Sequence, residues 1–119
     1  MKIEGKGKLL KIFIGESDRW QHEALYHVII KKIKEHGLAG ATTVRGIEGF
    51  GANSRVHTKN IEVLSQDLPI VIEVIDTEEK INEIISVIEP MITEGLMVIM
   101  HDVEIVKYAK SDQNKIIHR

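Results

Sequence analysis

Apolar residues change their spacing several times along the chain, and each change marks the border of a predicted element. Residues 8–15 are mostly apolar and β-branched, which favours a strand that ends at Gly15. From Asp18 onward apolar positions recur at helical spacing until Gly37, and Asp18 with Gln21 has the spacing of a capping box. This pattern predicts a long helix that starts near Asp18.

A second strand and a long polar connection follow. Residues 41–47 carry β-branched side chains that favour a strand, and glycines then loosen the backbone. Residues 51–67 are mostly polar, and a connection of this length in so small a domain is usually functional or mobile. We therefore expect a mobile loop over about 51–67.

The run 70–75 follows a proline and is almost entirely apolar, which predicts a central strand covered on both faces. Asp76 and Glu79 again have capping-box spacing, and a stripe of isoleucines at helical spacing comes after them. Pro90 should end or kink this second helix near Glu89, because proline lacks the N–H that a helix interior requires.

Extended segments complete the pattern. Residues 96–100 predict the last core strand, and alternating apolar and polar positions from Val103 to Tyr108 predict an extra C-terminal strand. The tail 110–119 is polar and is expected to fray.

The order of these elements is strand, helix, strand, strand, helix, strand. This order is typical of the ferredoxin-like α+β fold, in which an antiparallel sheet carries two helices on one face. A chain of 119 residues fits a single domain, so we predict one domain over 1–119 with its core at 8–108.

Composition narrows the functional classes. Hydrophobic residues make up 43% of the chain and charged residues 29%, as in globular proteins. A net charge of -2 provides no general field for nucleic acid or an anionic membrane surface, and the apolar runs are too short to insert into a bilayer. Without cysteine there is neither a disulfide framework nor a thiol nucleophile, and we expect a cytoplasmic protein.

The segment 45–51, Arg-Gly-Ile-Glu-Gly-Phe-Gly, is the most unusual part of the chain. Glycines let backbone N–H groups approach a phosphate closely, and Arg45 with Arg55 would neutralise it. The segment is neither a dinucleotide fingerprint nor a P-loop. The alternative is a bulged strand end at the rim of the sheet.

Residues 53–59 add side-chain donors directly after the glycines. Asn53, Arg55 and His57 supply donor groups suited to an anion or a nucleotide head group. A solvated loop would have the same composition, so both interpretations stay open.

Two chemical alternatives have weaker support. Glu23 and His27 are four residues apart on the first predicted helix and could ligate a metal, although such a pair is more often a solvated helix face. No nucleophile motif is present, and a slow nucleotide hydrolase with Glu48 or Glu94 as base is the weakest hypothesis.

Several blocks in order resemble a known family. Residues 40–51, His57 with Thr58, and residues 68–73 make the chain similar to an uncharacterised PII-like family, and to PII nitrogen-regulatory signalling proteins themselves, over roughly 8–108. The resemblance implies a homotrimer of ferredoxin-like subunits that binds adenine nucleotides in clefts between neighbours.

The resemblance also assigns residues. Gly49 and Gly51 would line the cleft, and Lys107 and Lys110 would lie near the phosphate. The chain departs from PII proteins in having a shorter loop without the modified-tyrosine segment, and in having Glu94-Gly95 in place of their glycine-rich phosphate turn.

We therefore predict a regulator, not an enzyme, whose loop docks on a target protein such as a membrane transporter or an enzyme. No cofactor is expected to be obligatory, and ADP, AMP or ATP would act as ligand. The alternative is a trimer that binds a divalent metal through some of His22, His27, His57 and His101. The predicted ligand-binding residues are Arg45, Gly46, Gly49, Phe50, Gly51, Asn53, Arg55, His57, Lys107 and Lys110.

Overall fold

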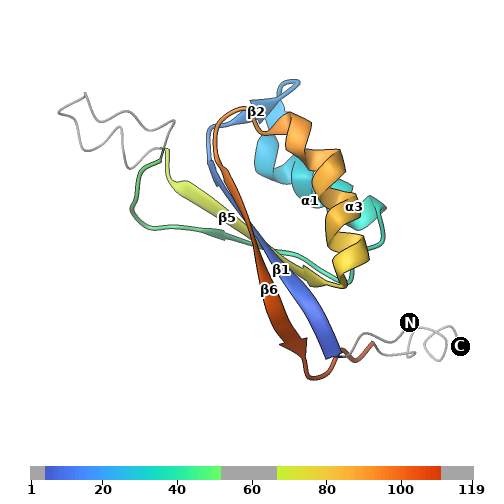
Figure 1. Ribbon diagram of the computed structural model, residues 1–119. Helices are drawn as coiled ribbons and strands as arrows, with labels where there is room; N and C mark the ends of the chain where they lie inside the picture. Colours follow the sequence, from blue (N-terminus) through green and yellow to red (C-terminus); the bar gives the residue numbers. More distant parts are fainter. Residues whose placement is uncertain (1–4, 52–66, 111–119) are drawn as a thin grey trace, which may run out of the picture.

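Two helices pack on one face of a four-stranded antiparallel sheet in the computed structural model, which describes residues 5–51 and 67–110 (Figure 1). A short hairpin precedes the first helix, and a single 3₁₀ turn follows the second. The elements are β1 (Gly5–Gly15), β2 (Arg19–Trp20), β3 (Glu23–Ala24), α1 (Leu25–Glu35), β4 (Thr42–Arg45), β5 (Pro69–Asp76), α3 (Glu78–Ile88), η1 (Glu89–Met91) and β6 (Leu96–Ile105).

The strand order is that of a ferredoxin-like sheet. The sheet runs β4-β5-β1-β6, so β1 lies at the centre and pairs antiparallel with both β5 and β6. Ile12, for example, is opposite Ile72 on one side and Met97 on the other. This topology confirms the predicted α+β fold with two helices on one face of the sheet.

The core lies between the sheet and the helices and is aliphatic. Alternate residues of the central strands face the helices, as the period of two in a strand requires, and the isoleucine stripe of α3 meets them. Burial of each such side chain contributes roughly 1.5–3 kcal/mol. The largest fully buried apolar side chains are Leu10, Ile12, Ile29, Ile33, Ile72, Val74, Ile81, Ile84 and Ile88.

The predicted start of the first helix near Asp18 is wrong, because α1 begins at Leu25. The Asp18 carboxylate accepts a hydrogen bond of 2.9 Å from Gly15 N, and its backbone oxygen accepts one of 2.8 Å from Leu25 N. The residues between Asp18 and Leu25 form the β2–β3 hairpin, with Gln21 and His22 at positive φ in its turn. Asp18 therefore closes a turn after β1 and does not cap a helix.

The second helix begins one residue later than the capping-box spacing predicts. Thr77 is its N-cap, and the hydroxyl of Thr77 accepts a hydrogen bond of 3.4 Å from Lys80 N. Asp76 is instead the last residue of β5 and is fully buried. The predicted end near Glu89 is confirmed, because α3 stops at Ile88 and Pro90 lies in η1.

The predicted extra C-terminal strand is the second half of β6 and not a separate strand. Gly7 pairs with Val103, whereas Leu9 pairs with Met100, so one residue of β1 faces two of β6. This is a β-bulge, and Asp102 has a φ of 50° within it. The bulge lets β6 continue to Ile105, which pairs with Gly5 at the start of β1.

Candidate functional site

A cleft of about 270 Å³ lies at the end of the sheet where β1 stops and β5 begins. It is formed by the end of β1, the turn before β6, the segment that follows β4, and the start of β5. We call it the first cleft. Its lining residues are Phe13, Ile14, Gly15, Asp18, Phe50, Gly51, Asp67, Pro69, Glu94, Gly95 and Leu96.

Two carboxylates hold the floor of the first cleft together. Asp67 Oδ1 accepts a hydrogen bond of 3.0 Å from Ser17 N, and Asp18 Oδ2 accepts the bond from Gly15 N. A Cβ at Gly15 would lie 3.0 Å from Asp67 Oδ1, so a side chain would crowd this carboxylate. The turn after β1 is thereby fixed against the start of β5.

The glycine-rich segment packs on Pro69. Gly46 N donates a hydrogen bond of 2.7 Å to Pro69 O, and a Cβ at Gly46 would come within 2.7 Å of Pro69 Cγ. Gly49 has a φ of 154°, and a Cβ there would lie 3.2 Å from the same carbon. These glycines permit a close approach that leads Phe50 and Gly51 into the first cleft, and the N–H of Gly46 is already used within the protein.

The turn before β6 forms the opposite wall. Gly95 has a φ of 148°, and a Cβ at this position would lie 2.7 Å from the carbonyl oxygen of Phe13. Only a glycine lets the turn approach the end of β1 this closely. Glu94 is thereby placed at the rim of the first cleft.

The structure separates the predicted ligand-binding residues into several groups. Phe50 and Gly51 line the first cleft, and the Phe50 side chain is 73% exposed. Arg45 does not line it, since its guanidinium Nη2 pairs with Glu16 Oε2 at 2.8 Å. The predicted residues Asn53, Arg55 and His57 lie outside the described residues, as does almost all of the expected mobile loop.

Lys107 lies at the other end of the sheet, in a second cleft of about 410 Å³. Residues 8–15 of β1 separate the two ends and span about 23 Å at the usual rise per residue. One small ligand therefore cannot contact Phe50 and Lys107 of the same protomer. Lys110 is exposed further along the same segment. The second cleft is lined by Ala39, Ile75, Val103, Glu104, Ile105, Val106, Lys107 and Tyr108.

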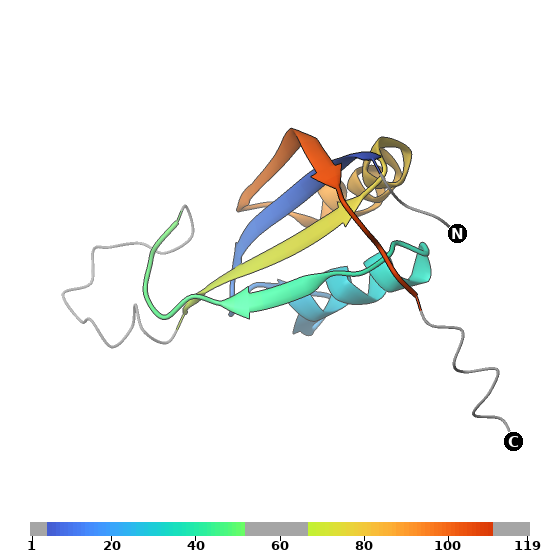
Figure 2. The same cartoon turned by 90° about the horizontal axis from the view of Figure 1, so that it is seen from below.

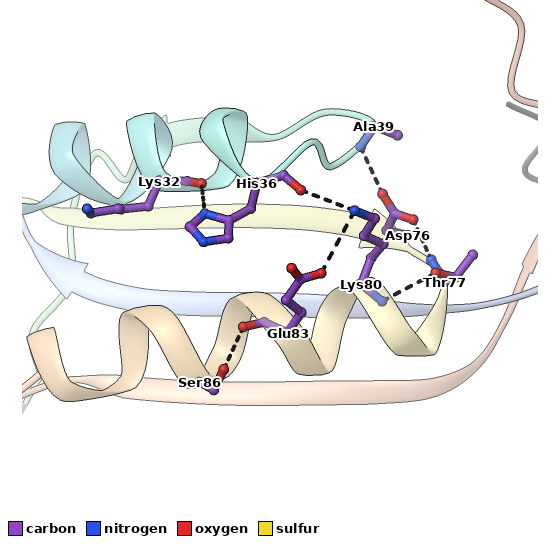
Figure 3. A network of polar contacts seen from close by, with 8 residues as sticks. All are labelled: Lys32, His36, Ala39, Asp76, Thr77, Lys80, Glu83 and Ser86. Atoms are coloured by element: carbon purple, nitrogen blue, oxygen red, sulfur yellow. Dashed lines mark hydrogen bonds and ion pairs between the residues drawn. The ribbon is translucent and has the colours of Figure 1, made fainter.

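A polar network that sequence reasoning missed supports the second cleft. The Asp76 carboxylate accepts hydrogen bonds from Ala39 N at 2.8 Å and Thr77 N at 2.7 Å, and Lys80 Nζ donates one of 3.3 Å to His36 O (Figure 3). The Tyr108 hydroxyl donates a hydrogen bond of 3.4 Å to Ala39 O. The network joins the end of α1, the start of α3 and the segment after β6.

The sheet face opposite the helices is largely apolar. Figure 2 looks onto this face, which neither α1 nor α3 covers. Near its centre Lys11 Nζ and Glu73 Oε2 form an ion pair at 3.3 Å. We call this uncovered face of the sheet the open face. By strand register its apolar members are Leu9, Phe13, Val44, Val71, Ile75, Leu96, Val98 and Met100.

The described residues give no support to the metal alternative. Within ranges 5–51 and 67–110 no group of three or more His, Cys, Asp or Glu side chains is placed to hold a metal ion. Glu23 pairs with Lys31 Nζ at 3.0 Å, and His101 Nδ1 contacts Lys8 Nζ. Among the described helices, none has the length and apolarity that a membrane span needs.

Sequence comparison places the chain among uncharacterised proteins. The model of the DUF190 family, described as Uncharacterized ACR, COG1993, matches residues 7–105. A UPF0166 protein of Methanocaldococcus jannaschii is 36% identical over 102 residues, which cover 86% of this chain and 94% of the relative. A UPF0166 protein of Aquifex aeolicus is 34% identical over 101 residues, which cover 85% of this chain and 94% of the relative.

Solved structures share the fold. CPII from Thiomonas intermedia, bound to ADP and bicarbonate, superposes with a TM-score of 0.60 at 18% identity, over 86% of this chain and 90% of that chain. A protein from Thermus thermophilus, described as a putative PII-like signaling protein, gives a TM-score of 0.55 at 18% identity, over 86% and 91% of the two chains. The fold is therefore that of PII-like proteins, and the predicted resemblance is confirmed.

Proposed function

The chain belongs to the DUF190 family of uncharacterised proteins, and on this basis we propose that it is a PII-like regulatory protein and not an enzyme. It binds an adenine nucleotide or a similar small ligand in the first cleft and transmits the bound state to a target protein. The observation that carries the proposal is the convergence of Phe50, Gly51 and the Glu94–Gly95 turn around one cleft. Phe50 and Gly51 belong to the glycine-rich segment 45–51, which the sequence predicts to bind the ligand.

The ligand is recognised mainly by its base. Phe50 is a mostly exposed aromatic ring on a cleft whose other lining side chains include Phe13, Pro69 and Leu96. A flat heteroaromatic ring stacks on such a surface and releases water from it. The binding of ADP by CPII, which shares this fold, supports an adenine base.

The functional unit is a homotrimer with composite sites. The open face is apolar across its strands, and a second copy of the chain would cover it. Because residues 8–15 of β1, which span about 23 Å, lie between Lys107 and the first cleft of one protomer, the two can serve one ligand only across a subunit boundary. A cyclic trimer would bring the second cleft of one protomer to the first cleft of its neighbour.

The output is contact with a target protein, a membrane transporter or an enzyme. The segment 51–67 starts at Gly51 and ends at Asp67, and both of these residues line the first cleft. A ligand that contacts them favours one arrangement of the segment over others, and this population shift is what a target would detect. We propose that the target docks on this segment of the cytoplasmic trimer.

Ligand-dependent thermal stability tests the proposal. The Tm of the unaltered chain and of the Phe50→Ala variant is measured without ligand and with adenosine, AMP, ADP, ATP or a divalent metal salt. The mass of the unaltered protein in solution is measured by light scattering. We expect a trimer whose Tm rises with an adenosine compound, and we expect Phe50→Ala to abolish the rise. A Tm that responds to metal ions alone would overturn the proposal in favour of the metal-binding trimer.

A further inference from the structure

An ion pair interrupts the apolar open face of the sheet. Strand register places Lys11 of β1 directly opposite Glu73 of β5, and their side chains meet at 3.3 Å. The neighbouring positions along the strands are apolar in both directions, so the charged pair lies between two apolar rows. One row is Val44, Val71, Phe13 and Leu96, and the other is Ile75, Leu9 and Met100.

The two charged side chains are able to bind further groups. Lys11 is 31% exposed and Glu73 is 45% exposed, so a molecule that covered the open face would reach both. A lysine ammonium has three N–H donors and a carboxylate has about four acceptor positions, whereas their mutual contact uses only one of each. Lys11 Nζ also lies 5.9 Å from the centre of the Phe13 ring, which favours the charged form of the amine.

A second copy of the chain on this face would bring like charges towards one another. In a cyclic trimer whose open faces surround the axis, a residue in the middle of one face approaches the same residue of the other two copies. Three Lys11 ammonium groups without a counter-charge would repel one another strongly, because water is excluded between the chains. With Glu73 present the six groups are neutral as a set, and each ammonium has carboxylates of two chains within reach.

We propose that Lys11 and Glu73 of the three protomers form an alternating ring of ion pairs around the trimer axis, and that this ring makes the open face selective for copies of its own chain. The inference rests on the proposed homotrimer and specifies what its interface recognises. The apolar rows contribute most of the affinity. The ring contributes specificity, because a partner without matching charges would strip water from both ions and offer nothing in return.

Charge variants of the full chain test the ring. Glu73→Gln leaves three ammonium groups without counter-charges, and Lys11→Gln leaves three carboxylates in the same state. We expect each change to raise the dissociation constant of the trimer at least about 10-fold, as measured by light scattering over a dilution series. Circular dichroism of each variant separates loss of assembly from loss of fold.

A mixing experiment distinguishes contacts between chains from the contact within one chain. Lys11→Glu gives a chain with two carboxylates at the ring, and Glu73→Lys gives a chain with two ammonium groups. Neither variant can form the ion pair within its own chain, but each supplies the charge that the other lacks. We expect both to be monomers alone and to form mixed trimers when they are combined at the same total concentration.

The matched control is Glu23→Gln, which breaks the 3.0 Å pair between Glu23 and Lys31 at β3 and α1, away from the open face. This control should leave the mass unchanged. Glutamine variants that assemble as tightly as the unaltered chain would overturn the inference and leave the homotrimer intact, as would a mixture that stays monomeric. An unaltered chain that is monomeric at every concentration would overturn both.

Discussion

The buried carboxylate of Asp76 accepts a hydrogen bond of 2.8 Å from the backbone N–H of Ala39, which lies 37 residues earlier in the chain. A second bond of 2.7 Å from Thr77 N uses its other oxygen. A buried backbone N–H group without an acceptor costs free energy. The Asp76 side chain supplies the acceptor for two such groups, one in the α1–β4 connection and one at the start of α3. In the sequence Asp76 has the spacing of a helix cap, whereas in the structure its carboxylate joins segments that are distant along the chain.

Replacement of Asp76 should destabilise the protein strongly. Asp76→Ala leaves two backbone N–H groups without their acceptor, so we expect the free energy of unfolding to fall by roughly 2–4 kcal/mol. Asp76→Asn retains one acceptor oxygen and should cost less. Urea denaturation measures both variants, with Glu35→Ala on the exposed surface of α1 as a control that should change stability by less than about 0.5 kcal/mol. Equal stability of Asp76→Ala and the control would contradict the role of the network.

A side chain at Gly95 should distort the first cleft. Gly95→Ala places a Cβ 2.7 Å from the carbonyl oxygen of Phe13 and occupies a φ that residues other than glycine rarely adopt. We expect a loss of roughly 1–3 kcal/mol in the free energy of unfolding, together with weaker ligand binding. Gly40→Ala is the matched control, because a Cβ at Gly40 would meet nothing within 4 Å. If both variants unfold at the same denaturant concentration, the close approach to Phe13 is not what requires glycine.

Phe50 should matter for binding and not for folding. Its side chain is 73% exposed, so Phe50→Ala removes little core packing and should leave Tm within a few degrees of the unaltered protein. Loss of the stacking surface should weaken the binding of an adenosine compound by roughly 10-fold, as measured by calorimetry. The control is Ile47→Ala, a change at a residue that is 94% exposed and does not line the first cleft. Unchanged affinity in Phe50→Ala would refute the proposed stacking.

A charge on the open face should break the proposed trimer. Met100 is half exposed on that face, and Met100→Glu would bury an unpaired carboxylate if a second copy covers it. The cost of several kcal/mol should raise the dissociation constant of the assembly by at least about 100-fold. Light scattering of the protein as it elutes from a size-exclusion column would then report monomers at concentrations where the unaltered chain is a trimer. The same substitution at Ile47, outside the sheet, should leave the mass unchanged, and a trimeric Met100→Glu would exclude this face from the interface.

Periodicity alone predicts much of this fold. The aliphatic runs of β1 and β5, the isoleucine stripe of α3 and the stop at Pro90 depend on local geometry, because side chains alternate in strands and recur every three to four residues in helices. These patterns also specify the inner face of the sheet and hence the topology of a ferredoxin-like domain. The glycine-rich segment could likewise be selected from composition, since glycine clusters mark close approaches.

Contacts between residues that are distant along the chain could not be predicted from periodicity or composition. Asp18 and Asp76 each have the sequence context of a helix cap, yet one binds the backbone of Gly15 and the other the backbone of Ala39. The choice among competing hydrogen-bond partners depends on which backbone groups are left unpaired once the sheet and helices have packed, and no local pattern records this.

Side-chain type at regular spacing was enough to establish most of the elements and the aliphatic core, and the sequence blocks 40–51 and 68–73 carry the resemblance to PII-like proteins. Three-dimensional packing was needed to show that Phe50 and Glu94 share a cleft and that Arg45 is paired with Glu16. Packing likewise places Lys107 at the far end of the sheet. These relationships depend on strand register and chain reversal, which set distances in space that cannot be measured along the sequence.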